Sequence, residues 1–323
     1  MRYGLTLIKL LLGMLVVANV AAADSFPSKP ITIIIPFAAG GTADPLARIL
    51  ADTIGKKTGA KFIVDSKPGA GGNIGNQAVV RSPKDGYTLL LGANNNFVVN
   101  QFLFPQSSVD VMKDFAFVSI LVDQPQMIYV PAAMPVKSFK EMVDYIKSKP
   151  GQLNYASPGP GSAPHLAGEL LADLYGLDLI HIPYKGGGPA VTALLAGDVQ
   201  LYFASMSVGK GQVQTGKLKA LATTSPVRLP GMPDVATTKE LGQGKFDVMN
   251  WWGLAAPKGT PAEAIQWLQK EFALALHDPS VVKRLEDLGF VIYASTPEQF
   301  ADRVKRESLL YQELIKKRKI SAQ

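Results

Sequence analysis

Two glycine-rich turns, each between a strand and a helix, are the parts of this sequence best suited to bind a ligand. The first follows the apolar run Ile31–Ile35 and ends at Thr42, and the second follows Leu153–Tyr155 and ends at Ser162. Thr and Ser suit the N-cap of the helix expected after each turn. A helix start carries unpaired N–H groups and a partial positive charge, which attract anions. If both turns face one cleft, they would hold a molecule with a carboxylate at one or both ends.

Asp44 places a carboxylate in the first turn of the first expected helix. One interpretation is a good helix start, because the helix dipole stabilises an acidic residue there. The other is an acceptor for a ligand amine, hydroxyl or bridging water.

A hydrolase is the enzymatic alternative, with Ser162 as nucleophile and His165 as base. No G-x-S-x-G elbow is present, because Pro164 stands where the second glycine would be, and capping is the simpler role for Ser162. The three histidines have no metal-ligand spacing, and the glycine turns match neither a Walker A nor a dinucleotide-binding fingerprint. We therefore expect no catalytic residues, no metal and no cofactor.

The first 23 residues have the pattern of a cleaved secretory signal peptide. Arg2 and Lys9 precede an apolar core, and three alanines come before Asp24. The chain has no cysteine, so disulfides, thiolate metal sites and lipid attachment at a cysteine are excluded. These features predict a periplasmic protein without a lipid anchor.

The charge pattern argues against nucleic acid as a partner. The formal net charge is +7, and Arg2 and Lys9 would leave with the signal peptide, while basic residues interleaved with aromatic ones are absent. A mild positive charge would help to gather small anions.

Strand and helix patterns alternate along the chain, which predicts an α/β fold of two lobes. The polar break at Asp123–Gln126 and the segment Asn250–Pro257 are the expected crossovers between the lobes. The expected lobes are 24–123 plus 250–323, and 124–249, with the ligand in the cleft between them. Trp251 and Trp252 are either ordinary core at this hinge or, for one of them, a wall of the cleft.

The sequence resembles the tripartite tricarboxylate transporter substrate-binding family, the TctC-like or Bug receptors, over nearly all of the mature chain. The resemblance rests on the order and spacing of several motifs. They are Pro36–Asp44 with Arg48, Lys67–Gly75, Asp85–Gly92, Leu153–Tyr155, Gly161–Ser162, His165–Gly168, Pro183–Gly186, Gly216–Ala222 and Met232–Val235.

The resemblance implies a periplasmic binding protein fold of the Venus flytrap kind, type II, most simply a monomer. It also implies that the two turns grip a ligand carboxylate, and that the receptor delivers the ligand to the membrane permease subunits of a tripartite tricarboxylate transporter. The ligand-binding residues expected on this basis are Phe37, Ala38, Ala39, Gly40, Gly41, Thr42, Asp44, Asn94, Ser157, Gly161, Ser162, Ala163, His165, Tyr184, Lys185, Ala204 and Ser205.

Ala204 departs from the family pattern, because many members have an acidic or amide residue there. The change removes a polar ligand contact, so an aromatic or more apolar acid is an alternative to an aliphatic one. Asn94, with the amides of Asn95 and Asn96, could compensate. A periplasmic sensor for a two-component system is the alternative to a transport receptor, because the two differ only in the docking partner.

Overall fold

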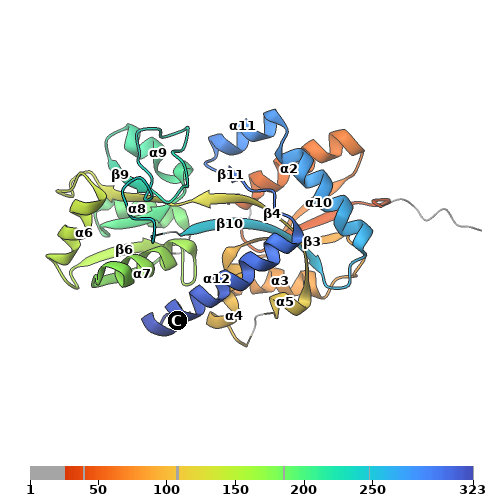
Figure 1. Cartoon of the computed structure of the whole chain (residues 1–323), viewed down its shortest axis with the longest axis horizontal. Coiled ribbons are helices and arrows are strands. Elements are labelled where there is room, and N and C mark those ends of the chain that lie inside the picture. Colours follow the sequence, from red (N-terminus) through yellow and green to blue (C-terminus); the bar gives the residue numbers. More distant parts are fainter. Residues whose placement is uncertain (1–25, 39–40, 107–108, 185, 247, 323) are drawn as a thin grey trace, which may run out of the picture.

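The computed structural model describes residues 26–38, 41–106, 109–184, 186–246 and 248–322. The predicted signal peptide, residues 1–23, lies outside this range. The chain forms two β-sheets, each with helices on both faces (Figure 1). Within the described ranges, none of the helices has both the length and the apolar character needed to cross a membrane.

The first sheet has six strands and mixed direction. β1 pairs in parallel with β2 and β3, whereas β10 runs antiparallel between β3 and β4. Across the sheet the order is β2 (Phe62–Ser66), β1 (Ile31–Ile35), β3 (Thr88–Ala93), β10 (Met249–Pro257), β4 (Phe115–Pro125) and β11 (Val291–Ile292).

The second sheet repeats this arrangement with five strands. β6 pairs in parallel with β7 and β8, and β5 runs antiparallel between β8 and β9. The order is β7 (Leu179–Pro183), β6 (Leu153–Ser157), β8 (Leu201–Ala204), β5 (Met127–Pro131) and β9 (Leu218–Thr223). Five strands of the first sheet therefore match the second sheet in spatial order and direction, with β11 added at the edge, although no sequence repeat predicts it.

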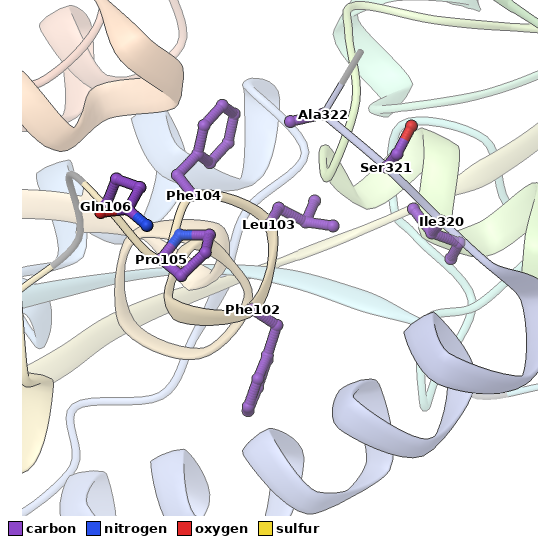
Figure 2. Close-up of a pocket in the computed structure, with 8 residues that line it drawn as sticks. All are labelled: Phe102, Leu103, Phe104, Pro105, Gln106, Ile320, Ser321 and Ala322. Carbon is purple, nitrogen blue, oxygen red and sulfur yellow. The ribbon is translucent and has the colours of Figure 1, made fainter.

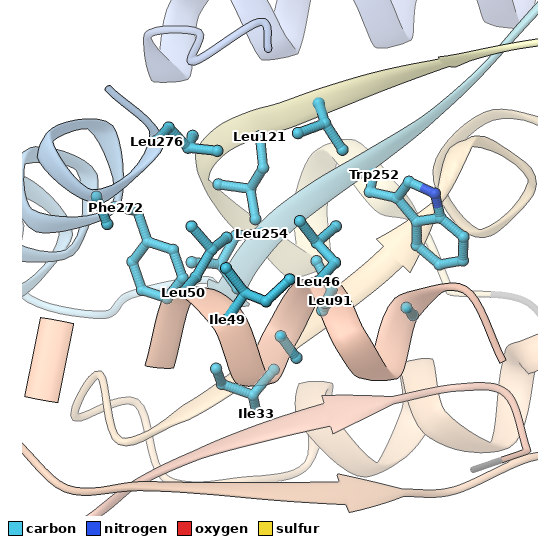
Figure 3. Close-up of a cluster of buried hydrophobic side chains, with 14 of the residues drawn as sticks. Ile33, Leu46, Ile49, Leu50, Leu91, Leu121, Trp252, Leu254, Phe272 and Leu276 are labelled. Carbon is cyan, nitrogen blue, oxygen red and sulfur yellow. The ribbon is translucent and has the colours of Figure 1, made fainter. Parts of the chain in front are cut away.

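Helices bury each face of the first sheet. On one face, Leu46 and Leu50 from α2 and Phe272 from α10 pack on Leu91 and Leu254 of the sheet (Figure 3). The helices there are α2 (Ala43–Thr58), α10 (Ala262–Leu276) and α11 (Pro279–Asp287), and those on the opposite face are α3 (Asn73–Val80), the π-helix η2 (Asn95–Val99) and α12 (Pro297–Arg318).

The second sheet is covered in the same way. α6 (Phe139–Lys147) and α7 (Ala163–Tyr175) pack on one face, and α8 (Gly187–Ala196) and α9 (Met206–Gln214) on the other. The remaining short elements are η1 (Ala70–Gly72), α4 (Asn100–Leu103) and α5 (Val111–Asp114).

The chain passes from the first sheet to the second with a single residue, Gln126, between β4 and β5. The expected break between strands at Asp123–Gln126 is therefore wrong, because β4 continues to Pro125. Its last residues stay in the strand because they pair with the start of β10, Gln124 opposite Asn250. The polar side chains of Gln124 and Gln126 line a cleft between the sheets and do not mark the end of the strand.

The hydroxyl of Thr224 joins the two crossovers. It accepts the backbone N–H of Gln126 at 2.9 Å and donates to the carbonyl of Val248 at 2.8 Å, and all three lie in the interior. One side chain thus links the chain leaving the first sheet to the chain returning to it.

Ion pairs of α12 connect the two sheets a second time. Arg303 is buried, and it pairs with Asp123 of β4 and with Glu307, each at 2.7 Å. At the other end of α12, Lys317 and Arg318 reach α7 and pair with acidic residues there at 2.6 and 2.7 Å. The C-terminal end of α12 accordingly lies against the second sheet's helices (Figure 1).

We predict that Thr224→Val destabilises the protein by about 2–3 kcal/mol, because it leaves a buried N–H and a buried carbonyl without partners at almost unchanged volume. Urea unfolding followed by circular dichroism measures the change. Thr192→Val is the matched control, since its exposed hydroxyl bonds only to a carbonyl within α8. Equal stability of the two variants would contradict the role assigned to Thr224.

Candidate ligand-binding site

A cleft of about 270 Å³ lies between the two sheets. Residues of both sheets line it, at the carboxyl ends of β1, β3, β6 and β8 and along the crossover strands. They are Phe37, Ala38, Gly41, Thr42, Ala43, Ala93, Asn94, Asn95, Gln124, Gln126, Pro158, Ser162, Ala163, Pro164, Gly187, Tyr202, Ala204, Ser205, Val208, Asn250 and Trp252.

Four helices begin at this cleft. The first residues of α2, α7, α8 and α9, or the residues just before them, are part of its lining. Parallel strands cause this convergence, because each helix follows the carboxyl end of its strand. The two sheets present these ends toward each other.

None of these four helix starts has a side-chain cap. Elsewhere, Ser138, Asp278 and Thr296 cap α6, α11 and α12 through their side chains. Thr42 and Ser162 do occupy the predicted N-cap positions, but the hydroxyl of Ser162 donates to the carbonyl of Gly159 at 2.6 Å instead. α3 and α10, which begin away from the cleft, also lack a side-chain cap. At the cleft, no N-cap side chain occupies the first-turn N–H groups, which are open to a ligand.

The described lining of the cleft is polar. Its lining includes the amides of Asn94, Asn95, Gln124, Gln126 and Asn250, and no ionisable Asp, Glu, Lys, Arg or His side chain among the described residues. Burial also raises the pKa of the Tyr202 phenol, which stays neutral. An anion here would be held by neutral donors and helix dipoles.

The structure gathers over half of the sequence-predicted site residues at this cleft. Ala39, Gly40 and Lys185 lie outside the described residues. The predicted residues that line the cleft are Phe37, Ala38, Gly41, Thr42, Asn94, Ser162, Ala163, Ala204 and Ser205.

Five predicted residues lie outside the lining, among them Asp44. Both of its carboxylate oxygens accept hydrogen bonds from Arg48, each at 3.0 Å, one turn along α2. This matches the helix-start interpretation of Asp44. Gly161 is packed against Leu103 instead, and Tyr184 donates its backbone N–H to Ser157.

The other two, Ser157 and His165, belong to a buried cluster behind the second turn. The rings of His165 and His181 stack with centroids 3.8 Å apart, and His181 Nε2 is 2.6 Å from Ser157 Oγ. His165 Nδ1 accepts the backbone N–H of Gly161 at 3.0 Å. The histidines thus support the turn that lines the cleft. Among the described residues, His165 and Ser162 do not form the hydrogen bond that a hydrolase would need.

Sequence reasoning missed the amides on the crossover strands. The cleft lining includes Gln124, Gln126 and Asn250. The sequence signal that could have identified them is polar residues in segments already expected to cross between the lobes. The two tryptophans have different environments, as one of the two interpretations expected. Trp252 lines the cleft, whereas Trp251 is fully buried and donates its indole N–H to Glu307.

A second cavity, of about 530 Å³, lies between α4 and the C-terminal residues (Figure 2). Phe102, Leu103, Phe104, Pro105 and Ile320 make most of its wall. No helix begins there, so this cavity has little to offer a carboxylate. Over the described part of the chain, no three His, Asp or Glu side chains gather as metal ligands.

Comparison with known proteins identifies the family. The model of the tripartite tricarboxylate transporter family receptor, TctC, matches residues 46–320. This chain belongs to that receptor family. The UPF0065 protein in the tcbD-tcbE intergenic region of Pseudomonas sp. (strain P51) is 35% identical over 93% of this chain and 89% of its own length. BugT of Bordetella pertussis is 35% identical over 90% of both chains.

Solved structures of TctC-type receptors share the fold. The periplasmic binding protein BugD is 35% identical, with a TM-score of 0.79 over 92% of this chain and 100% of its own. An R. palustris protein with adipate is 28% identical, with a TM-score of 0.82 over 92% and 99%. MatC from Rhodopseudomonas palustris with bound malate is 31% identical, with a TM-score of 0.78 over 90% and 100%. The family and these neighbours are binding proteins, so the chain is a receptor and the hydrolase alternative is dropped.

We predict that the buried histidine pair makes stability fall as the pH is lowered. Burial lowers the pKa of His165 to about 4, and burial followed by the charge of His165 lowers that of His181 to about 4. Between pH 7 and 5 the unfolded chain takes up protons that the folded protein excludes, at a cost of about 2 kcal/mol for each histidine.

Urea unfolding at pH 7 and pH 5 measures this dependence. His165→Gln should remove about half of the histidine share of the loss, and His277→Gln, at an exposed site, controls for the substitution itself. A pH dependence unchanged in His165→Gln would refute the assignment.

Proposed function

We propose that this receptor captures a small mono- or dicarboxylate in the cleft between its two sheets and delivers it to a tripartite tricarboxylate-type membrane transporter. The observation that carries the proposal is the set of four helix starts without side-chain caps around a cleft whose described lining is rich in amides and has no charged side chain. Such a site stabilises negative charge without a fixed cation.

The ligands named for two neighbouring structures support an organic acid. One is described with adipate and the other with malate, which are both dicarboxylates. A cleft of about 270 Å³ is a fitting size for acids of this length. Ala204 in its lining leaves room for an aliphatic or an aromatic far end, and the panel below distinguishes them.

In this proposal the protein works in the periplasm after removal of residues 1–23. The lobes are 24–123 plus 250–323 and 124–249, joined where β4 meets β5 and where the chain returns to β10. The start of α2 belongs to one lobe and those of α7, α8 and α9 to the other, so one anion contacts both sets only when the lobes are close together. Ligand binding thereby favours the closed state.

The test is a thermal-shift and calorimetric screen of protein that has been unfolded and refolded to strip ligand. Succinate, malate, adipate, citrate, benzoate and terephthalate form the panel. An acid present at 100 times its Kd should stabilise the protein by about 2.7 kcal/mol, a rise of several degrees in Tm. Absence of binding to every acid would overturn the proposal.

Thr42→Asp should separate binding from stability. An aspartate at the N-cap of α2 caps the free N–H groups, so unfolding free energy should stay equal or rise by up to about 1 kcal/mol. Affinity for the acid should fall at least tenfold, because the new carboxylate competes for the same groups and repels the ligand.

Thr42→Asn is the matched control, since it caps without charge and should weaken binding less. Calorimetry and urea unfolding on the three proteins make the comparison. Undiminished affinity in Thr42→Asp would show that the α2 start does not contact the ligand.

A further inference from the structure

The side-chain amide of Gln124 has a fixed orientation. Its Oε1 accepts hydrogen bonds from Asn250 Nδ2 at 2.9 Å and from Trp252 Nε1 at 3.3 Å, and both donors lie on β10. Turning the amide round would place its NH₂ group against two donors. The hydrogen bonds therefore determine which end of the amide is free.

The free end is a buried donor. Gln124 is only 3% exposed, and its Nε2 finds no hydrogen-bond acceptor among the described residues. Buried donors without acceptors are rare because they destabilise the folded protein. Gln124 also lines the ligand cleft, at the point where the chain crosses between the sheets. An oxygen of a bound ligand would satisfy this donor.

The same cleft has nothing to neutralise a ligand ammonium group. No carboxylate is part of its described lining, and Asp44 already binds Arg48 through both oxygens. An amino-acid ligand would therefore bury an ammonium group whose only carboxylate partners are its own, which is unfavourable.

We propose that Gln124 is a specificity-determining residue that donates from Nε2 to an oxygen of the ligand. Together with the absence of a carboxylate in the cleft, it selects organic acids without an α-ammonium group over the corresponding amino acids. This inference rests on the proposed function and narrows its ligand class.

The first experiment compares matched acids on the refolded wild-type protein by calorimetry at pH 7. Succinate is paired with aspartate, and glutarate with glutamate, so that each pair differs by the ammonium group alone. The acid without the ammonium group should bind at least tenfold more tightly. Equal binding, or tighter binding of the amino acid, overturns the proposal without any variant.

Two substitutions then test the donor itself. Gln124→Met removes it at similar size and should weaken binding of the preferred acid roughly ten- to a hundredfold. In Gln124→Glu, one carboxylate oxygen can still accept the hydrogen bonds from Asn250 and Trp252. The other oxygen takes the position of Nε2. This variant should bind the acid still more weakly, and the ratio of its affinities for succinate and aspartate should shift toward aspartate.

Gln266→Glu adds the same charge at an exposed site on α10 and should bind like wild type. Circular dichroism and Tm show whether each variant is folded. If the wild type binds an acid and the folded Gln124 variants bind it equally well, the role of Gln124 is refuted while the receptor function stands. If the wild type binds no acid, the proposed function itself fails.

Discussion

The Thr224 hydroxyl is the contact on which the arrangement of the two sheets depends. It bonds to Gln126 on the outgoing chain and to Val248 on the returning chain, so both crossovers have one common anchor. Because only Gln126 separates β4 from β5, the two sheets cannot drift apart at this edge. The ion pairs of α12 with β4 and α7 add a second link between the sheets.

This anchoring holds helix starts from both sheets around one cleft. Parallel strands in each sheet end toward the other sheet, and the helices that follow them begin there without side-chain caps. In the proposed function, the partial positive charges of these helix starts hold the anionic ligand. Neutral donors also avoid the cost of burying an unpaired cation when no ligand is bound.

Much of the fold could be read from the sequence because its periodic patterns are strong. β1 has the bounds of the apolar run Ile31–Ile35, and α2 and α7 begin directly after Thr42 and Ser162 as expected. The helical patterns of α8 and α9 are weaker, since α8 begins within a glycine run and α9 contains Gly209 and Gly211. Both helices begin at the cleft without a side-chain cap, and departures from local sequence rules are expected at functional sites.

The sequence by itself determined the α/β class, the two glycine turns, the family resemblance and nine of the residues that line the cleft. Only the tertiary structure decided that Asp44 binds Arg48 within α2, that His165 stacks on His181 behind the turn, and that Gln124 has one free donor. These contacts join residues that are far apart along the chain, or they depend on the orientation of a side chain. Local secondary-structure propensity predicts neither, because packing between elements selects the partner of each side chain.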